Sequence, residues 1–255
     1  MSLFMKNRIT LLLITFVMFA WLLIGCSDKT DASMANEGVS ASENVQIPEN
    51  IYSTDDFDNM ITIAGQTFFV GETNLDLSSQ DLSDISQLKD LTQLMTLDLR
   101  ENKISDLSPL QDLNDLIFLG LEDNQITDLT PLTSLTGLLE LYLDDNQISD
   151  ATPLMGLNNL ELLYMNGNKI SDMTPFKDLV SLTGLYLEFN QISDLTPLES
   201  MTHLSELSLA RNMISDLSPL KSLTNLTWLT IDYNPLSQEQ IDELQAALPD
   251  CEIIF

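Results

Sequence analysis

The chain offers few residues of the kind that carry out catalysis. It has one histidine, His203, and two cysteines, Cys26 and Cys251, in 255 residues. These are too few for a Cys/His zinc cluster, a disulfide framework or most histidine-based mechanisms. His203 occupies a slot that equivalent segments fill with Gln, Asp or Asn, which indicates a variable exposed position. Nucleophile elbow, phosphate loop and paired histidine motifs are absent from the sequence. We therefore predict no catalytic residue, no metal and no cofactor, and a protein that is not an enzyme.

Charge is strongly one-sided. The chain has 39 Asp and Glu residues against 10 Lys and Arg residues, a formal net charge of −29 at pH 7. Such a field repels the phosphate backbone of nucleic acids and the headgroups of anionic lipids. This excludes nucleic acid as a partner and favours a protein or peptide with a basic surface.

One set of aspartates recurs every 22 residues and raises the question of stacked calcium sites. Its members are Asp84, Asp106, Asp128, Asp150, Asp172, Asp194 and Asp216. Six oxygen ligands are not evident near any of them, so we interpret them as local caps or a solvated edge. The acidic stretch at 55–59 raises the same question, but it lacks the glycine and the closing glutamate of an EF-hand loop.

The 22-residue spacing extends over most of the chain and is clearest in a column of asparagines. These are Asn102, Asn124, Asn146, Asn168, Asn190, Asn212 and Asn234. In the unit at 91–110, Leu97 and Leu99 alternate with polar residues, which predicts a short strand with inward-facing leucines. Asn102 then turns the chain, with its amide placed to satisfy backbone groups of neighbouring turns. Ser108-Pro109 predicts an N-cap hydroxyl and a proline at the start of a 3₁₀ or short helical turn.

This unit resembles a leucine-rich repeat, specifically the 22-residue variety found in internalins. The resemblance extends from about Leu75 to Leu236 and implies an α/β leucine-rich repeat solenoid. Strands about 4.8 Å apart on one wall and bulkier turns on the other require the stack to curve. We expect a curved parallel β-sheet on the concave face and 3₁₀ or short turns on the convex face, with residues 74–236 forming about eight repeats.

A repeat array needs a cap at each end, because one unit cannot bury its own apolar face. We expect an N-terminal cap at 50–73, in which residues 53–70 form a short helix followed by a hairpin with its turn at Gly65-Gln66. We expect a C-terminal cap at 237–255. There, Ser237 and Gln240 form a capping-box pattern that opens a helix with its apolar stripe at Ile241, Leu244 and Leu248. A last strand follows, in which Cys251 is a buried structural thiol.

Residues 1–25 are predicted to be a lipoprotein signal peptide. Lys6 and Arg8 precede an apolar run at 9–24, which is shorter than the ~20 residues that a spanning helix needs. The run ends in Leu-Ile-Gly-Cys, which resembles a bacterial lipobox and implies that Cys26 is lipidated. Residues 26–49 lack a periodic apolar set and are expected to form a flexible tether. We expect the protein at the extracytoplasmic face of the cell membrane, lipid-anchored. An uncleaved signal anchor is the alternative.

The outward positions around the predicted strands carry the candidate partner-binding residues. Seven are aromatic: Phe118, Tyr142, Tyr164, Tyr186, Phe189, Trp228 and Tyr233. Acidic residues share this wall: Asp98, Glu122, Glu140, Asp144, Glu188 and Asp232, with Asp76, Glu101, Asp123, Asp145 and Glu206 beside them. Only Arg100 and Arg211 oppose them. Exposed Tyr and Trp side chains are frequent binding hot spots, and carboxylates around them select basic partners.

These residues predict a membrane-anchored module that binds a cationic protein or peptide on its concave face, as the resemblance to internalins also implies. Carbohydrate binding is the alternative, with the tyrosines stacking on cell-wall glycan. The aromatic column also has a structural interpretation, because cross-strand aromatic pairs stabilise a sheet by themselves. Unlike the best-known internalins, the sequence shows no immunoglobulin-like domain after the repeats and no C-terminal sorting motif. We therefore expect the N-terminal lipid to replace attachment to the cell wall.

Overall fold

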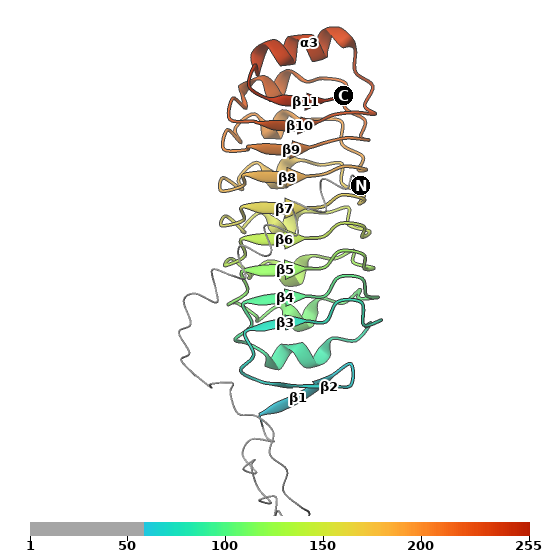
Figure 1. The fold of residues 1–255 in the computed structure, drawn as a ribbon, viewed down its shortest axis with the longest axis vertical. Helices are drawn as coiled ribbons and strands as arrows, with labels where there is room; N and C mark the ends of the chain where they lie inside the picture. Colours follow the sequence, from blue (N-terminus) through green and yellow to red (C-terminus); the bar gives the residue numbers. More distant parts are fainter. Residues whose placement is uncertain (1–58) are drawn as a thin grey trace, which may run out of the picture. The chain divides into compact units, whose positions relative to one another are not determined.

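The structure is a computed structural model that describes residues 59–255. The predicted signal peptide, the lipidation site Cys26, the tether and most of the acidic stretch at 55–59 lie outside the described residues. The described part begins with a hairpin, continues as a stack of repeats and ends in a helix and a last strand (Figure 1).

The hairpin consists of β1 (Met60–Ile63) and β2 (Gln66–Phe69), which pair antiparallel with Met60 opposite Phe69. The expected hairpin is present, with its turn at Ala64-Gly65, one residue before the expected position, and Met60–Ile63 is one of its strands and not part of the expected helix. The segment Met-Ile-Thr-Ile is rich in β-branched residues, which favour a strand. Ala64 and Gly65 follow with φ of 51° and 76°, the left-handed backbone that a tight two-residue hairpin turn requires.

The main sheet has nine parallel strands arranged in the order of the chain. They are β3 (Asn74–Asp76), β4 (Thr96–Asp98), β5 (Phe118–Gly120), β6 (Glu140–Tyr142), β7 (Leu162–Tyr164), β8 (Gly184–Tyr186), β9 (Glu206–Ser208), β10 (Trp228–Thr230) and β11 (Glu252–Ile254). From β3 to β10 each residue pairs with the one 22 positions later, as Leu75 does with Leu97. This register places equivalent positions of successive repeats side by side.

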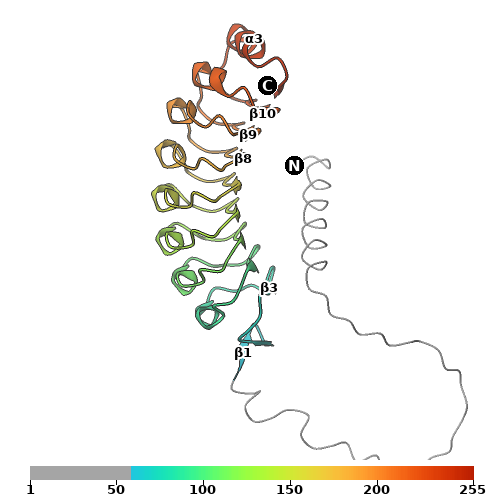
Figure 2. The same ribbon diagram turned by 90° about the vertical axis from the view of Figure 1, so that its left-hand side faces the viewer.

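A short 3₁₀ helix follows each strand from β3 to β9 and lies on the opposite wall. These are η1 (Ser86–Asp90), η2 (Ser108–Leu110), η3 (Thr130–Leu132), η4 (Thr152–Leu154), η5 (Thr174–Phe176), η6 (Thr196–Leu198) and η7 (Ser218–Ser222). The strands run along the concave side of the arc and the 3₁₀ helices along the convex side (Figure 2). The predicted solenoid is confirmed.

The 3₁₀ helices are capped by the aspartate column and not by the predicted hydroxyls. In η2, Ser108 is already the first helical residue and its hydroxyl makes no capping bond. The Oδ1 of Asp106 instead accepts the backbone N–H of Ser108 at 2.9 Å, and this bond lowers the pKa of Asp106. Every member of the column makes the same contact, at 2.8–2.9 Å. The interpretation of these aspartates as local caps is confirmed.

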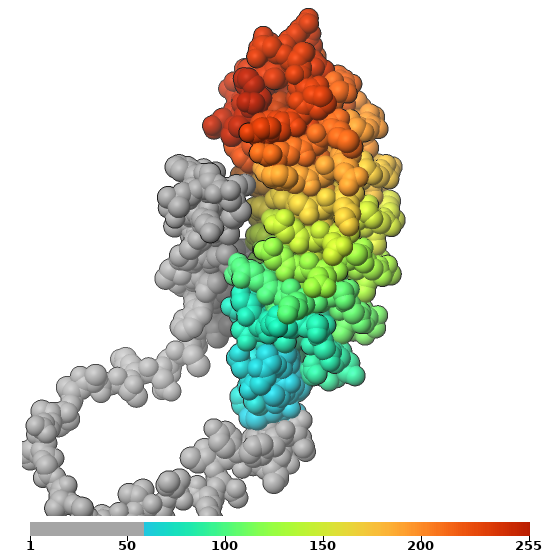
Figure 3. Space-filling view, turned by 90° about the vertical axis from the view of Figure 1, so that its right-hand side faces the viewer, coloured from blue at the N-terminus to red at the C-terminus, as the bar shows by residue number. Residues whose placement is uncertain are grey.

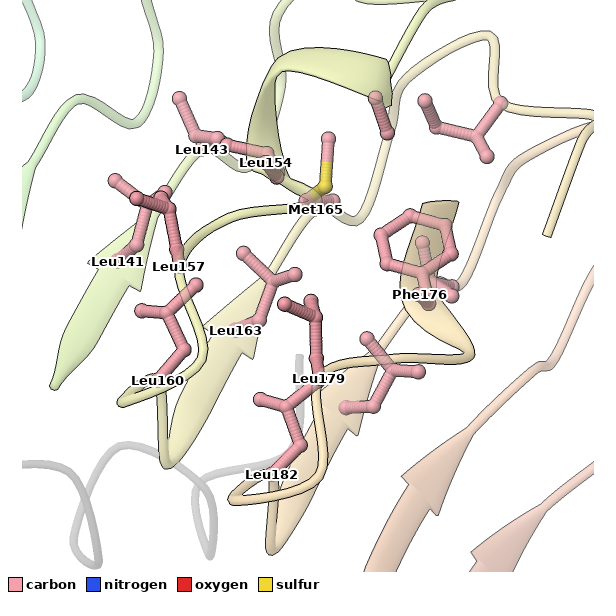
Figure 4. Close-up of a cluster of buried hydrophobic side chains, with 14 of the residues drawn as sticks. Leu141, Leu143, Leu154, Leu157, Leu160, Leu163, Met165, Phe176, Leu179 and Leu182 are labelled. Atoms are coloured by element: carbon pink, nitrogen blue, oxygen red, sulfur yellow. The ribbon is translucent and has the colours of Figure 1, made fainter. Parts of the chain in front are cut away.

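The core lies between the two walls and is built from leucines of every repeat. Leu141 and Leu163 point inward from their strands and Leu154 and Phe176 from their 3₁₀ helices, all with 0% exposure. Figure 4 shows these side chains pointing toward one another across successive repeats. In Figure 3 the repeats form successive colour bands stacked directly on one another. Each repeat therefore completes the burial of its neighbours.

The asparagine column joins adjacent repeats, as predicted. The Nδ2 of Asn146 donates to the carbonyl oxygens of Leu121, Leu143 and Asp144 at 2.9–3.2 Å. Its Oδ1 accepts the N–H of Ile126 at 2.9 Å, also from the preceding repeat. The side chain is 7% exposed, so these bonds replace water that cannot reach the backbone groups.

The C-terminal elements match the expected cap. Helix α3 (Gln238–Ala247) begins with a capping box between Ser237 and Gln240 and buries Ile241 and Leu244. Strand β11 then joins the edge of the sheet beside β10, and Cys251 is a buried free thiol. Between residues 59 and 255, no helix is both long and apolar enough to cross a membrane.

Candidate partner-binding surface

The concave wall is formed by side chains that alternate with the buried leucines of the strands. In β6, Leu141 is buried while Glu140 and Tyr142 are half-buried on the outward side. Because the sheet register is uniform, these positions form columns across the repeats. The column at the last strand position contains Asp76, Asp98, Gly120, Tyr142, Tyr164, Tyr186, Ser208 and Thr230.

Five rings on this wall form a continuous series, which we call the aromatic ladder: Phe118, Tyr142, Tyr164, Tyr186 and Trp228. The rings of Tyr142 and Tyr164 stack with centroids 4.7 Å apart and planes 9° apart, and those of Tyr164 and Tyr186 with 4.0 Å and 5°. Phe118 and Trp228 close the two ends in tilted contacts at 5.3 and 6.2 Å. The faces of the central rings therefore cover one another.

Neighbouring carboxylates accept hydrogen bonds from the ladder. The hydroxyl of Tyr142 donates to Glu140 at 2.9 Å, and that of Tyr186 donates to Glu206. Burial raises the pKa of Tyr164 to about 12 and raises those of Tyr142 and Tyr186 as well. All three therefore remain neutral phenols at physiological pH. The ladder is a preorganised wall with polar edges.

The ladder does not expose every ring that the sequence analysis placed in solvent. Tyr186 is only 4% exposed, because Tyr164, Trp228 and the Glu206 carboxylate contact it on the outward face. It lies outside the leucine core, but its predicted role as a solvent-facing anchor is wrong. Phe118, Tyr142, Tyr164 and Trp228 are half-buried. Phe189 and Tyr233 are 54% and 70% exposed.

Three predicted acids follow one another at the N-terminal end of the ladder: Asp98 and Glu122 lie beside Gly120, and Asp144 interacts with Glu122. A Cβ at Gly120 would lie 3.2 Å from both the Oδ1 of Asp98 and the Oε2 of Glu122, so glycine leaves room for two carboxylates. Burial raises the pKa of Asp98 and Glu122, and raises that of Asp144 to about 7. The Oε2 of Glu122 is buried without a hydrogen bond among the described residues. This end of the wall therefore holds incompletely compensated negative charge.

Two further predicted acids, Glu188 and Asp232, lie near the C-terminal end of the wall. Glu188 accepts a hydrogen bond from the Ser208 hydroxyl, which also pairs with Thr230 at 2.6 Å. Asp232 is half-buried. Nowhere in residues 59–255 do three or more His, Cys, Asp or Glu side chains come together in a group able to hold a metal ion.

Sequence reasoning missed two residues that organise this wall. Asn166 links repeats, since its N–H donates to Asp144 at 2.7 Å and its Oδ1 accepts the N–H of Glu188 at 2.7 Å. Gly120 permits the close approach of Asp98 and Glu122. A glycine inside a strand is a recognised sign of close approach, so the sequence did contain a signal at Gly120.

At the C-terminal end, the wall carries an aromatic pair with a cation between its rings. The guanidinium carbon of Arg211 lies 4.7 Å from the ring centroid of Phe189 and 3.9 Å from that of Tyr233. The three residues are equivalent positions of successive repeats, and all have positive φ, at 53°, 57° and 56°. Arg100, the other arginine on the wall, instead forms an ion pair with Asp98 at 2.8 Å.

Comparisons with known proteins agree with this architecture. The family model described as Leucine Rich repeats (2 copies) matches residues 114–154 and 158–200. The chain is similar to the crystal structure of internalin C2 from Listeria monocytogenes, with 34% identity and a TM-score of 0.69 over 72% of this chain and 80% of that one. A second Listeria monocytogenes internalin, inlF, is 31% identical with a TM-score of 0.53 over 71% of this chain and 66% of that one.

A leucine-rich repeat protein of Leptospira interrogans is 28% identical, with a TM-score of 0.61 over 71% of this chain and 54% of that one. No curated protein sequence gives a significant match.

Proposed function

The chain belongs to the internalin-like leucine-rich repeat proteins, and from that membership we propose that its concave face binds another protein. The observation that carries the proposal is the aromatic ladder on that face. Large rings held on a rigid sheet lose little conformational entropy on binding, which makes them effective anchors. The anchors in this proposal are the half-buried rings and the exposed Phe189 and Tyr233.

The acids on the same wall support a basic partner. Asp98, Glu122 and Asp144 are brought together at one end, where burial already opposes their ionisation. A lysine or arginine of a partner that approached this end of the wall would be attracted by these carboxylates, of which Glu122 is not compensated by a hydrogen bond to its Oε2. Complementary charge of this kind mainly increases the association rate and the specificity.

Ring geometry favours protein over carbohydrate as the ligand. A sugar that stacks on an aromatic residue needs a free ring face. In the ladder, Tyr164 has a tyrosine on each side, at 4.7 and 4.0 Å between centroids. The ladder therefore offers edges and half-buried rims, which suit the side chains of a protein surface better than a pyranose ring.

The site of action in this proposal is the extracytoplasmic face of the cell membrane, with the chain anchored through lipid on Cys26. The support is the sequence before the repeats: a basic start, an apolar run and a small residue before the cysteine. Two or three acyl chains suffice for stable anchoring.

The test uses the full chain, purified in detergent, to capture proteins from the cell envelope and the culture fluid. The affinity for whichever protein is captured is then measured. Tyr164→Ser should weaken binding about tenfold or more, which is the effect of losing a hot-spot side chain. Val180→Ser is the matched control, because Val180 is 61% exposed and lies between η5 and β8, away from the ladder.

Circular dichroism and melting curves establish that both variants are folded. Affinity should also fall as ionic strength rises, because the acids contribute long-range attraction that salt screens. The proposal fails if Tyr164→Ser is folded and binds the captured protein as tightly as the parent chain does.

A further inference from the structure

The Arg211 side chain is unusual among the charged groups of the concave wall. Both faces of its guanidinium are covered by rings, at 3.9 Å from Tyr233 and 4.7 Å from Phe189. None of the ion pairs or hydrogen bonds recorded among residues 59–255 uses its guanidinium N–H groups. Arg211 is thus an unpaired cation in a chain with a formal net charge of −29.

The backbone of this stack has the same left-handed conformation as the rest of its column, and only the side chains differ. The equivalent positions in earlier repeats are Ser79, Glu101, Asp123, Asp145 and Gly167, which include the residue types that tolerate a left-handed backbone best. Phe189, Arg211 and Tyr233 adopt the same conformation with bulky side chains, which costs free energy. Inter-repeat hydrogen bonds from the N–H groups of Phe189 and Arg211, at 3.0 and 2.8 Å, hold them there.

The chemistry of the stack specifies what it can bind. A guanidinium presents its N–H donors in its own plane. With both faces covered, the donors at its edge are what remains for a ligand. A carboxylate matches this edge with two parallel hydrogen bonds, and stacking on rings keeps the guanidinium in one orientation before binding. Phosphate, with its higher charge, is opposed more strongly by the net negative charge of the chain.

We propose that the Phe189–Arg211–Tyr233 stack is a binding site for a carboxylate side chain of the protein partner. The inference rests on the proposed function and adds to it: the partner surface combines basic groups facing the acidic end of the wall with an Asp or Glu facing Arg211. Such a pairing of opposite charges at the two ends of one wall fixes the orientation of the partner.

The stack can be tested without the partner, so its failure is distinguishable from failure of the proposed function. The chain contains only three arginines, Arg8, Arg100 and Arg211. Selective ¹⁵N-arginine labelling of the full chain in detergent therefore gives at most three Nε–H signals, and the variants R211K and R100K assign two of them. The probe is N-acetylglutamate amide, a model of a glutamate side chain, and N-acetylglutamine amide is its uncharged control.

We expect the glutamate probe to shift the Arg211 signal in a saturable way, with a dissociation constant in the millimolar range. The glutamine probe should leave it unchanged. Arg100 is the internal control, because its guanidinium already pairs with the carboxylate of Asp98 through one terminal nitrogen. Inorganic phosphate should bind Arg211 more weakly than the glutamate probe. Y233A should weaken the glutamate response at least threefold, because it uncovers one face of the guanidinium.

The carboxylate site is refuted if the Arg211 signal does not respond, if Arg100 responds equally, or if phosphate binds more tightly than the glutamate probe. Where a captured partner is in hand, R211Q should weaken its binding at least fivefold and R211K at least threefold, since lysine keeps the charge and loses the planar fork. If R211Q binds that partner with the parent affinity while Tyr164→Ser does not, the assignment of the partner's carboxylate to Arg211 is overturned and the proposed function stands.

Discussion

Removal of one buried asparagine should reveal how strongly the repeats are joined. We choose Asn146→Ala, in the middle of the array. The Oδ1 of Asn146 is the recorded partner of the Ile126 N–H, at 2.9 Å, and Ile126 is 0% exposed. The substitution leaves that N–H without an acceptor.

The other bonds of Asn146 are less costly to lose. The carbonyl of Leu121 also accepts a bond from Asn124 at 3.1 Å, so it keeps one donor after the substitution. An unsatisfied buried N–H costs about 1–3 kcal/mol, and each of the two N–H groups of the lost amide contributes about 1 kcal/mol net. We therefore expect Asn146→Ala to lower the free energy of unfolding by about 3–5 kcal/mol, a large part of the ~5–15 kcal/mol of a typical domain.

The assay is urea denaturation followed by far-ultraviolet circular dichroism, with Asn234→Ala as the matched control. Asn234 makes the same set of bonds in the last repeat, and its partner Ile214 is also 0% exposed, but Asn234 itself is only partly buried, so water can take the place of its side chain at the Ile214 N–H. We expect a loss of about 1 kcal/mol or less there. Equal losses at the two positions, or no loss at Asn146, would refute the argument that burial determines the cost.

The variant N146D separates the donor from the acceptor. It keeps an oxygen for the Ile126 N–H but directs a carboxylate at the carbonyls of Leu121, Leu143 and Asp144. Burial and these carbonyls raise the folded-state pKa of the new carboxyl above its unfolded value of about 3.9. Stability relative to the parent is therefore greatest below the unfolded pKa and is lost as pH rises through the folded pKa. A deficit that does not grow between pH 4.5 and pH 7.5 would contradict this.

Two further predictions concern the acidic wall and the N-terminus. Asp144 has a pKa raised by burial from 3.8 to about 7, so its ionisation destabilises the fold as pH rises from about 4 to above 7. Asp144→Asn should therefore raise the free energy of unfolding by about 1–2 kcal/mol at pH 8 and leave it unchanged at pH 4. The gain is smaller than the ~4 kcal/mol that the full pKa shift implies, because the side chain is partly solvated. Urea denaturation at the two pH values measures this, and an equal gain at both would contradict it. Cys26→Ala should abolish incorporation of labelled palmitate and release the chain from membranes without detergent. Cys251→Ala is the control and should leave labelling intact, because Cys251 is buried. Unchanged labelling of the Cys26 variant would exclude the lipid anchor.

Much of the architecture could be predicted from local spacing. Leu97 and Leu99 alternate with polar residues, and Asn102 recurs at 22 residues, so each unit specifies its own inside and outside. The capping box at Ser237 was equally readable, because it depends on residues three apart. The failures were local as well. The turn of the N-terminal hairpin lies at Ala64-Gly65, one residue before the expected position, and the carboxylate of Asp106 caps the 3₁₀ helix where the hydroxyl of Ser108 was expected to do so.

The sequence predicted which residues of the candidate site share a column of the sheet. It did not predict which of their side chains are exposed. Alternation correctly placed Tyr142, Tyr164 and Tyr186 in one column of the sheet. It could not show that ring stacking and the Glu206 carboxylate leave Tyr186 almost without exposure. Nor did it show that the missing side chain of Gly120 lets the carboxylates of Asp98 and Glu122 approach each other.

The sequence alone determined the curved parallel stack of repeats. The repeat length and the pattern of leucines and asparagines suffice for this, because the same local interactions form in every repeat. Which outward side chains remain accessible, paired or unpaired was decided only by the assembled stack. Phe189 and Tyr233 are each 22 residues from Arg211 along the chain. Their ring centroids nevertheless lie only 4.7 and 3.9 Å from the guanidinium carbon of Arg211. Contacts at that range depend on rotamers chosen jointly by neighbouring repeats, and no single repeat contains that information.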